Sequence, residues 1–199
     1  MDKIASHRQY FEQSFEQQRL PSQQLSGIEF ESCEFNKCDF SSVVFTRCKF
    51  IDCTFNHCNL SLMQVPYSQF VEVVFVECKL VGVDWTRAAW PSFQLHAELQ
   101  FKQCILNDAS FFGLTLNGLV LERCKLHEVD WREGDFSNSV MTDCDFSNSL
   151  FMRTKLNKVD FTDSCHFSIN VLENTLTKAR FSRYEALSLL ESLGIELVD

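Results

Sequence analysis

The sequence has few glycines and no long apolar run, and each absence excludes a class of protein. Six of its 199 residues are glycine, and none of them belongs to a loop of the kind that cradles phosphate groups. No apolar stretch is long enough for a signal peptide or a membrane-spanning helix. We therefore expect a cytoplasmic protein without a nucleotide-binding loop.

Positive charge is also scarce. The chain carries 18 lysines and arginines against 27 aspartates and glutamates, which gives a net charge of -9. A surface of this sign repels phosphate, so we expect no direct binding to nucleic acid and no binding to a membrane. The expected partner is basic, or normally binds something acidic.

A large apolar residue recurs at every fifth position over a long stretch of the chain. In its clearest part the large residues are Phe30, Phe35, Phe40, Phe45, Phe50, Phe55 and Leu60. An amphipathic helix repeats near 3.6 residues and a half-buried strand repeats at two, so this period predicts a solenoid built from five-residue units. A smaller inward position lies two residues before each large one, as Cys33 does before Phe35.

The ten cysteines follow this packing register with one exception. Nine of them fall at the small inward position: Cys33, Cys38, Cys48, Cys53, Cys58, Cys78, Cys104, Cys124 and Cys144. Cysteines placed in this way act as small hydrophobic residues in a reducing interior. Only Cys165 lies outside the register, and no Cys-x2-Cys or Cys/His spacing indicates zinc. We therefore predict no bound metal.

The repeat divides the chain into three parts. Residues 25-181 form the solenoid, with one break near residues 91-100, where a bulge or short loop between Pro91 and Glu98 shifts the register by one residue. Residues 1-24 form an N-terminal arm or an imperfect first coil, and a helix over residues 7-18 is the competing interpretation. Cysteines spaced twenty residues apart indicate that four units make one coil.

The final part, residues 182-199, has the pattern of a capping helix with an apolar tail. Ser182 and Glu185 have the spacing of a capping box, and Gly194 is suited to end the helix. The apolar side chains exceed one face of so short a helix, which favours a two-fold dimer. The predicted dimer interface consists of Tyr184, Leu187, Leu190 and Leu193.

No catalytic pattern accompanies the solenoid. Parallel β-helices include lyases and acyltransferases, but the histidines show no pairing with a spaced nucleophile or carboxylate motif. An interior filled with phenylalanine and leucine also leaves no cleft for a substrate. We therefore predict that the protein is not an enzyme and that it has no catalytic residue and no cofactor.

The units CEFNK, CDFSS, CKFID, CDFSN and VDFTD resemble those of the pentapeptide-repeat proteins over roughly residues 25-165. This resemblance implies an all-β fold, a right-handed quadrilateral β-helix, here followed by a short C-terminal α-helix. The segments 59-114 and 179-199 resemble, more narrowly, the subgroup of the Qnr quinolone-resistance proteins and the immunity proteins against albicidin and microcin B17. Qnr members from Gram-negative bacteria carry two projecting loops, whereas this sequence has room for one short bulge at most.

The subgroup resemblance implies a function and a set of partners. It implies a cytoplasmic homodimer, joined through its C-terminal ends, that imitates duplex DNA. Its partner would be a bacterial type II topoisomerase, DNA gyrase or topoisomerase IV, which it would protect from quinolones or natural gyrase poisons. A structural scaffold that binds an unrelated protein is the alternative, since it shares every feature of the fold.

Outward carboxylates are the candidate partner-binding residues. Those that we expect on the acidic face are Asp52, Glu72, Asp108, Glu128, Asp143, Asp163, Asp145 and Asp160. With a coil of twenty residues, Asp52 stacks with Glu72, Asp108 with Glu128, and Asp143 with Asp163. Such ladders of carboxylates are suited to stand in for phosphates. Basic residues such as Arg123 interrupt them, so an ordinary solvated surface is the competing interpretation.

Overall fold

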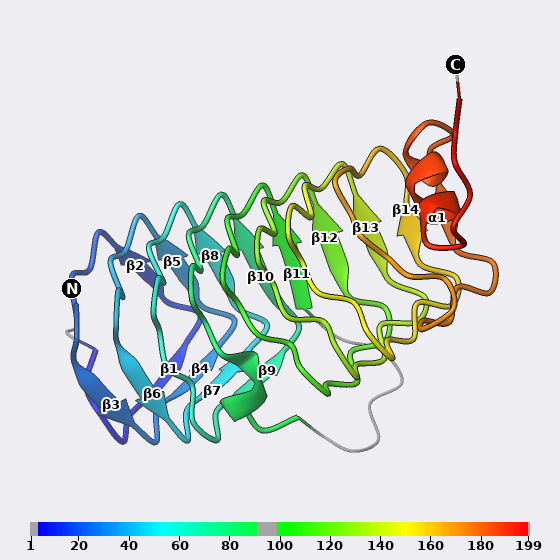
Figure 1. The fold of residues 1–199 in the computed structure, drawn as a ribbon. Helices are drawn as coiled ribbons and strands as arrows, with labels where there is room; N and C mark the ends of the chain where they lie inside the picture. The colour runs from blue at the N-terminus through cyan, green and yellow to red at the C-terminus, as the bar shows by residue number, and fades with distance from the viewer. Residues whose placement is uncertain (1–3, 91–98, 199) are drawn as a thin grey trace.

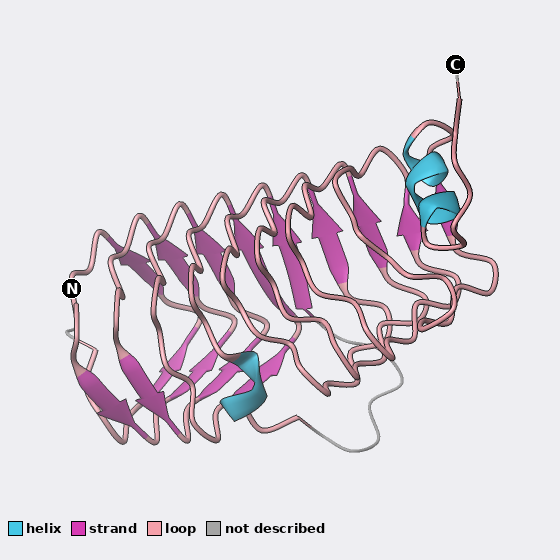
Figure 2. Ribbon diagram, viewed as in Figure 1, coloured by secondary structure: helices cyan, strands magenta, loops and turns pink. Residues whose placement is uncertain are grey.

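A computed structural model describes residues 4-90 and 99-198. The chain winds as a right-handed quadrilateral β-helix whose first coil and C-terminal helix lie at opposite ends of the solenoid axis (Figure 1). Among the described residues a coil has four short faces, and its strands and bridges pair in parallel with those of the neighbouring coils (Figure 2). The all-β fold class predicted from the repeat is confirmed.

The four faces are named A to D in the order in which the chain visits them. Face A carries β1 (Gln9–Phe11), β4 (Glu29–Glu31), β7 (Lys49–Ile51) and β9 (Gln69–Val71). Face B is a nine-stranded sheet of β2 (Ser14–Glu16), β5 (Glu34–Asn36), β8 (Thr54–Asn56), β10 (Val73–Val76), β11 (Leu99–Lys102), β12 (Val120–Glu122), β13 (Val140–Thr142), β14 (Asp160–Phe161) and β15 (Arg180–Phe181). Face C is held by single bridges, such as Asp39 to Asn59. Face D carries β3 (Gln24–Ser26) and β6 (Val44–Thr46) and continues as single bridges.

The strand register confirms the twenty-residue coil. Phe30 pairs with Phe50 and Phe50 with Phe70, as the ladder interpretation requires. The rings of Phe30 and Phe50 stack with centroids 5.1 Å apart. Phe30, Phe50 and Phe70 therefore form a column along the axis, and this column gains ring stacking in addition to the burial of apolar area.

The coil that contains the break is longer than the others. Phe75 pairs with Phe101, 26 residues further along the chain, whereas Phe101 pairs with Leu121 at the usual twenty. The bulge expected between Pro91 and Glu98 lies outside the described residues. Just before it, the indole of Trp90 donates to the carbonyl oxygen of Trp85 at 2.8 Å and packs against the core.

The small inward position is filled as the register predicts. All nine cysteines in the register are buried, while Cys165 is partly exposed. Burial raises the pKa of the Cys53 thiol to about 12, so this group is uncharged at neutral pH. The burial of all nine indicates that the cysteines in the register act as packing residues.

Residues 4-24 wind as a coil of the same solenoid. Strand β1 pairs with β4, and β2 pairs with β5, so residues 7-18 adopt extended structure rather than the alternative helix. The Tyr10 hydroxyl accepts a hydrogen bond from the Ala5 N–H at 2.9 Å.

The C-terminal helix is shorter than the apolar pattern suggested. It consists of η2 (Glu185–Leu187) and α1 (Ser188–Glu191), and it covers the last coil (Figure 1). The capping-box prediction is wrong, because the hydroxyl of Ser182 accepts from the Asp163 N–H at 2.8 Å instead of capping the helix. Gly194 ends the helix with φ at +72°, and its N–H donates to the Glu191 carbonyl oxygen at 2.9 Å.

One further short helix, η1 (Trp85–Arg87), projects from face D. The Asp84 carboxylate accepts from the Thr86 N–H at 3.0 Å and thereby caps it. Within the described ranges, no helix has the length and apolar character needed to cross a bilayer.

Candidate partner-binding surface

The predicted carboxylates occupy the corners of the solenoid because of the backbone turn there. In the regular coils the residue two positions after the large inward residue has a positive φ, for example 49° at Asp52 and 53° at Glu72. This left-handed conformation turns the chain from one face to the next and directs the side chain outward. Asp52, Glu72, Asp108, Glu128, Asp143 and Asp163 are all exposed corner residues, whereas Asp145 and Asp160 lie on faces and are partly buried.

These eight carboxylates do not gather on one face. Asp52 and Glu72 lie at the corner between faces A and B, and Asp108 and Glu128 lie at the corner between faces C and D. Asp143 lies one coil from Asp163 at the corner between faces B and C. Each corner therefore contributes a pair of stacked acids rather than a continuous ladder.

Several of the acids are paired with bases from neighbouring positions. Arg123 lies 3.6 Å from the Asp143 carboxylate, and Arg180 lies 3.0 Å from that of Asp160. Further pairs join Glu29 with Lys49, Asp84 with Arg87, Asp130 with Arg132, Glu133 with Arg153, and Asp135 with Lys155. Exposed pairs of this kind contribute little to stability, about 0–1 kcal/mol each, but they reduce the local field.

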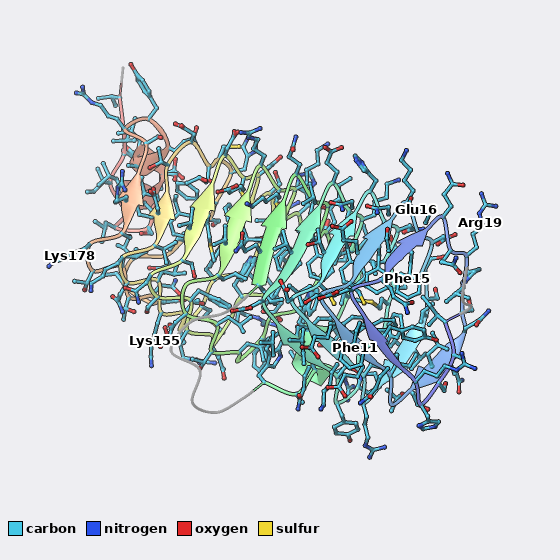
Figure 3. All side chains as sticks on the ribbon, turned by 180° about the vertical axis from the view of Figure 1, so that it is seen from behind. Phe11, Phe15, Glu16, Arg19, Lys155 and Lys178 are labelled. Atoms are coloured by element: carbon cyan, nitrogen blue, oxygen red, sulfur yellow. The ribbon has the colours of Figure 1, made fainter. Side chains whose placement is uncertain are left out.

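The surface carries charges of both signs along its length. Figure 3 shows Glu16 and Arg19 projecting at the N-terminal end, and Lys155 and Lys178 near the C-terminal end. In the part of the chain that the structure describes, Glu72, Asp108 and Glu128 have no ion-pair partner. Negative charge is therefore local and concentrated at particular corners.

The corner between faces B and C contains a hollow of about 510 Å³, which we name the acidic hollow. It is lined by Glu122, Arg123, Thr142, Asp143 and Asp163. Its three carboxylates come from three successive coils, and Ser182 fixes Asp163 by donating to Oδ1 at 2.9 Å. A basic side chain of a partner fits this arrangement, because three carboxylates outnumber the single guanidinium.

Asp145 lies beside this corner on face C and is held in its charged form. Partial burial acts to raise its pKa, but hydrogen bonds from Ser147, His166 and His127 outweigh burial and hold the pKa well below its usual range. The Ser147 hydroxyl donates to Oδ1 at 2.7 Å. Asp145 therefore adds a fixed negative charge next to the acidic hollow.

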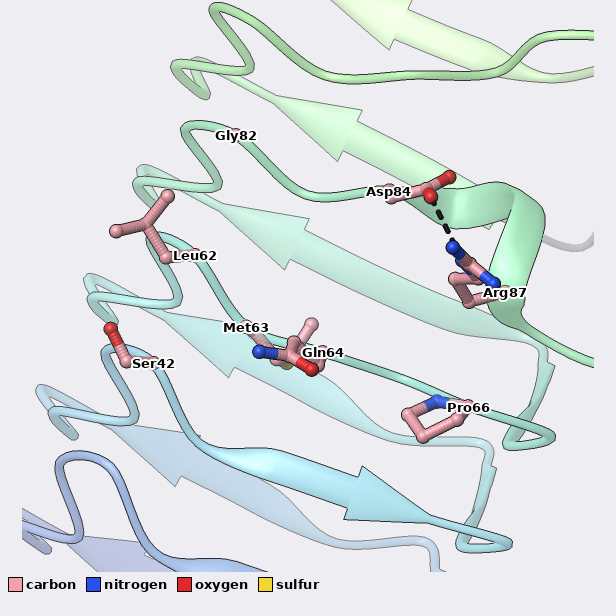
Figure 4. Close-up of a pocket in the computed structure, with 8 residues that line it drawn as sticks. All are labelled: Ser42, Leu62, Met63, Gln64, Pro66, Gly82, Asp84 and Arg87. Atoms are coloured by element: carbon pink, nitrogen blue, oxygen red, sulfur yellow. Dashed lines mark hydrogen bonds and ion pairs between the residues drawn. The ribbon is translucent and has the colours of Figure 1, made fainter.

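Face D has a second depression, of about 590 Å³, that the sequence did not indicate as a site (Figure 4). It is lined by Ser42, Leu62, Met63, Gln64, Pro66, Gly82, Asp84 and Arg87. Its one ion pair joins Arg87 Nε to Asp84 Oδ2 at 3.2 Å, and Asp84 also caps η1. The lining residues offer apolar contacts and hydrogen bonds, and the one acid–base pair among them, Asp84 and Arg87, is already joined in an ion pair. The depression is therefore suited to binding rather than to catalysis. The sequence signal for it is Leu62, a large apolar residue at an outward position.

The residues predicted for the dimer interface lie at the C-terminal end. Tyr184, Leu187 and Leu193 are exposed, and Leu190 is half-buried. Leu189 turns the other way and packs against the core. The exposed apolar tail Ile195, Leu197 and Val198 extends the same apolar surface.

Comparison with known proteins gives the family. No curated protein matches the chain. A structure of trypsin-treated QnrB1, described as a plasmid-mediated fluoroquinolone resistance protein, is 20% identical, covers 98% of this chain and 99% of its own, and has a TM-score of 0.58. HetL, from the cyanobacterium Nostoc, is described as a pentapeptide-repeat protein involved in heterocyst differentiation regulation. It is 14% identical, covers 88% of this chain and 85% of its own, and has a TM-score of 0.54.

At these identities the two structures show a shared fold. The model of the pentapeptide repeat region matches residues 28–98 and 94–161, which is more than half of the sequence. This chain belongs to the pentapeptide-repeat family.

Proposed function

We propose that this protein imitates duplex DNA, binds a bacterial type II topoisomerase, and protects that enzyme from quinolones or natural gyrase poisons. The partner is DNA gyrase or topoisomerase IV, and the protein acts in the cytoplasm by binding rather than by catalysis. Support comes from the subgroup resemblance of segments 59-114 and 179-199, and from the solenoid that the chain shares with QnrB1 over nearly its whole length.

The acidic hollow is the observation that carries the proposal. Glu122, Asp143 and Asp163 present carboxylates from successive coils, which are separated by about 4.8 Å along the axis. Measured along the axis of duplex DNA, the phosphates of one strand recur every ~3.4 Å, so the two arrays of negative charge have a similar axial spacing. A partner surface that holds phosphates with lysine and arginine is complementary to such an array.

A homodimer joined through Tyr184, Leu187, Leu190 and Leu193 completes the proposed arrangement. The acidic hollow lies in the coils next to the C-terminal helix, so such a dimer brings two hollows toward its centre. Binding should weaken as salt rises, and less steeply than for DNA, because fewer counterions are released.

Charge reversal in the hollow tests this proposal. The variant Asp143→Lys with Asp163→Lys should lose protection in a gyrase cleavage assay with a quinolone, since it replaces two of the three carboxylates. The fold should persist, because Lys37 and Arg123 already occupy equivalent corner positions with positive φ.

The matched control is Glu31→Lys with Glu34→Lys, which changes the net charge equally in the early coils. It should retain protection. Full protection by the Asp143→Lys, Asp163→Lys variant would exclude the acidic hollow from the mechanism. If the wild-type protein protected neither topoisomerase against any of several poisons, the scaffold function with an unrelated partner would replace this one.

A further inference from the structure

Three side chains of different chemistry converge on one point of face C. The Nδ1 atom of His166 lies 2.9 Å from Oδ1 of Asp145 and 3.4 Å from Sγ of Cys165. The nitrogen, oxygen and sulfur atoms all lie within 4.8 Å of one another. Asp145 comes from one coil, and Cys165 and His166 come from the next.

The backbone departs from the solenoid register at this place. In a regular coil residue 166 would be the large inward residue, but His166 has φ of 57° and is exposed, while Phe167 is buried instead. Phe151 then pairs with Ile169, two positions short of the twenty-residue register. The early turn directs the His166 side chain toward Asp145, and it leaves Cys165 as the one cysteine that is not packed in the core.

The geometry differs from that of a nucleophile relay. In a relay the histidine contacts the nucleophile through one ring nitrogen and the orienting carboxylate through the other. Here Cys165 and Asp145 both approach the same nitrogen of His166. Convergence on a single point is the arrangement of ligand atoms around an ion.

We propose that Asp145, Cys165 and His166 bind a divalent ion of the zinc class, with the fourth coordination position open to solvent. A tetrahedral zinc ion with ligands at 2.0–2.3 Å separates its ligand atoms by roughly 3.3–3.7 Å. The distance of 3.4 Å between Sγ of Cys165 and Nδ1 of His166 lies in this range, and Nδ1 and Oδ1, which are 2.9 Å apart, would move slightly apart around the ion. One thiolate and one carboxylate neutralise the charge of the ion, and a mixed sulfur, nitrogen and oxygen set suits this borderline-soft metal.

Neighbouring groups orient the ligands. The Nε2 atom of His127 lies 2.9 Å from Oδ2 of Asp145, and the Ser147 hydroxyl donates to Oδ1. His127 is therefore a positioning residue, which leaves the other oxygen of Asp145 directed toward Cys165 and His166. The nearby carboxylates of Asp143 and Glu185 make the surroundings negative, which favours a cation.

Sequence spacing does not reveal this site, because Asp145 is adjacent to Cys165 and His166 in space but lies one coil away from them in the chain. The off-register Cys165 is the available signal. A bound ion would join the coil of Asp145 to the following one and so stabilise the C-terminal end of the solenoid. This inference does not depend on the proposed function.

Cobalt(II) substitution tests the site directly. The full-length protein, reduced and treated with a chelator, should bind one equivalent of Co²⁺ and show a thiolate-to-cobalt charge-transfer band. Cys165→Ser should abolish that band, and His166→Asn should weaken Co²⁺ binding at least tenfold. His127→Asn should keep the band and weaken binding about 10–100-fold, as expected for a residue that orients a ligand.

His57→Asn is the matched control, because His57 is also an exposed histidine beside a carboxylate, that of Glu77 at 3.1 Å. Among the described residues, His57 belongs to no cluster that includes a cysteine. His57→Asn should leave binding unchanged. Zn²⁺ should raise the melting temperature of the wild type and of His57→Asn but not that of Cys165→Ser, and circular dichroism checks that each variant is folded. The absence of the charge-transfer band in wild type, or its persistence in Cys165→Ser, would overturn the proposal.

Discussion

Phe136 shows what the solenoid interior requires of a single side chain. Its ring is fully buried and packs edge-to-face against Trp131, with centroids 5.0 Å apart. It also lies directly over Gly134, where an added Cβ would approach the ring to 2.4 Å. Gly134 is therefore fixed by space rather than by backbone conformation, and the two positions are matched in volume.

Replacement of Phe136 by alanine should lower the free energy of unfolding by about 3–5 kcal/mol, because the rigid coils cannot collapse around the cavity. Ser61→Ala, on the outside of face C, is the control and should change it little. Denaturant unfolding followed by circular dichroism measures both. Equal unfolding midpoints for the two variants would contradict the inward assignment of Phe136.

At the scale of the element, the sequence predicts the regular five-residue units of the coil but not the places where the chain departs from them. The five-residue period alone defines which side chains point inward, and it correctly assigns nine cysteines to the core. The capping-box spacing fails at Ser182, whose hydroxyl bonds to Asp163 one coil earlier, and the five-residue period fails at His166, where the turn comes early. Both exceptions depend on contacts between coils, which a linear pattern does not contain.

The acidic residues show the same limit. Their outward direction follows from the repeat, since each corner position turns the chain and exposes its side chain. Which carboxylates share a corner follows from the twenty-residue coil, as it does for Asp143 and Asp163. Which of them are paired with arginine, as Asp143 is with Arg123, and which line a hollow depends on the side-chain contacts between stacked coils. The acidic hollow could therefore be located only in the folded chain.

The corner itself can be tested at Leu62, a branched side chain held at φ of 58° and largely exposed. Leucine is disfavoured in this left-handed conformation, whereas asparagine adopts it readily. Leu62→Asn should therefore raise the free energy of unfolding by about 0.5–1 kcal/mol. Chemical denaturation of the wild type and of Leu62→Asn measures this difference in the free energy of unfolding.

Leu150→Asn is the comparison, because Leu150 is similarly exposed but lies in an extended segment bridged to Asp130. Leu150→Asn should not raise the free energy of unfolding. If both variants shifted stability equally, the corner conformation would not be the cause.

At the scale of the whole molecule, the proposed dimer makes a direct prediction. Leu187→Glu with Leu193→Glu places charge in the apolar C-terminal surface and should give monomers, since burying an unpaired carboxylate in the interface is strongly unfavourable. Light scattering at micromolar concentration measures the mass. Leu172→Glu, at an exposed leucine outside the predicted interface, should remain dimeric. A monomeric wild type would refute the dimer.

The tryptophan residues give this solenoid an optical property of its own. Trp85 and Trp131 are fully buried on either side of Phe111, and within the described residues their indole nitrogens have no hydrogen-bond partner. Trp90 lies at the edge of the core, immediately before the break. Two of the three fluorophores therefore emit from an apolar column, while the third is only partly buried at its edge, so quenching of Trp90 reports on the surroundings of the break separately from the core.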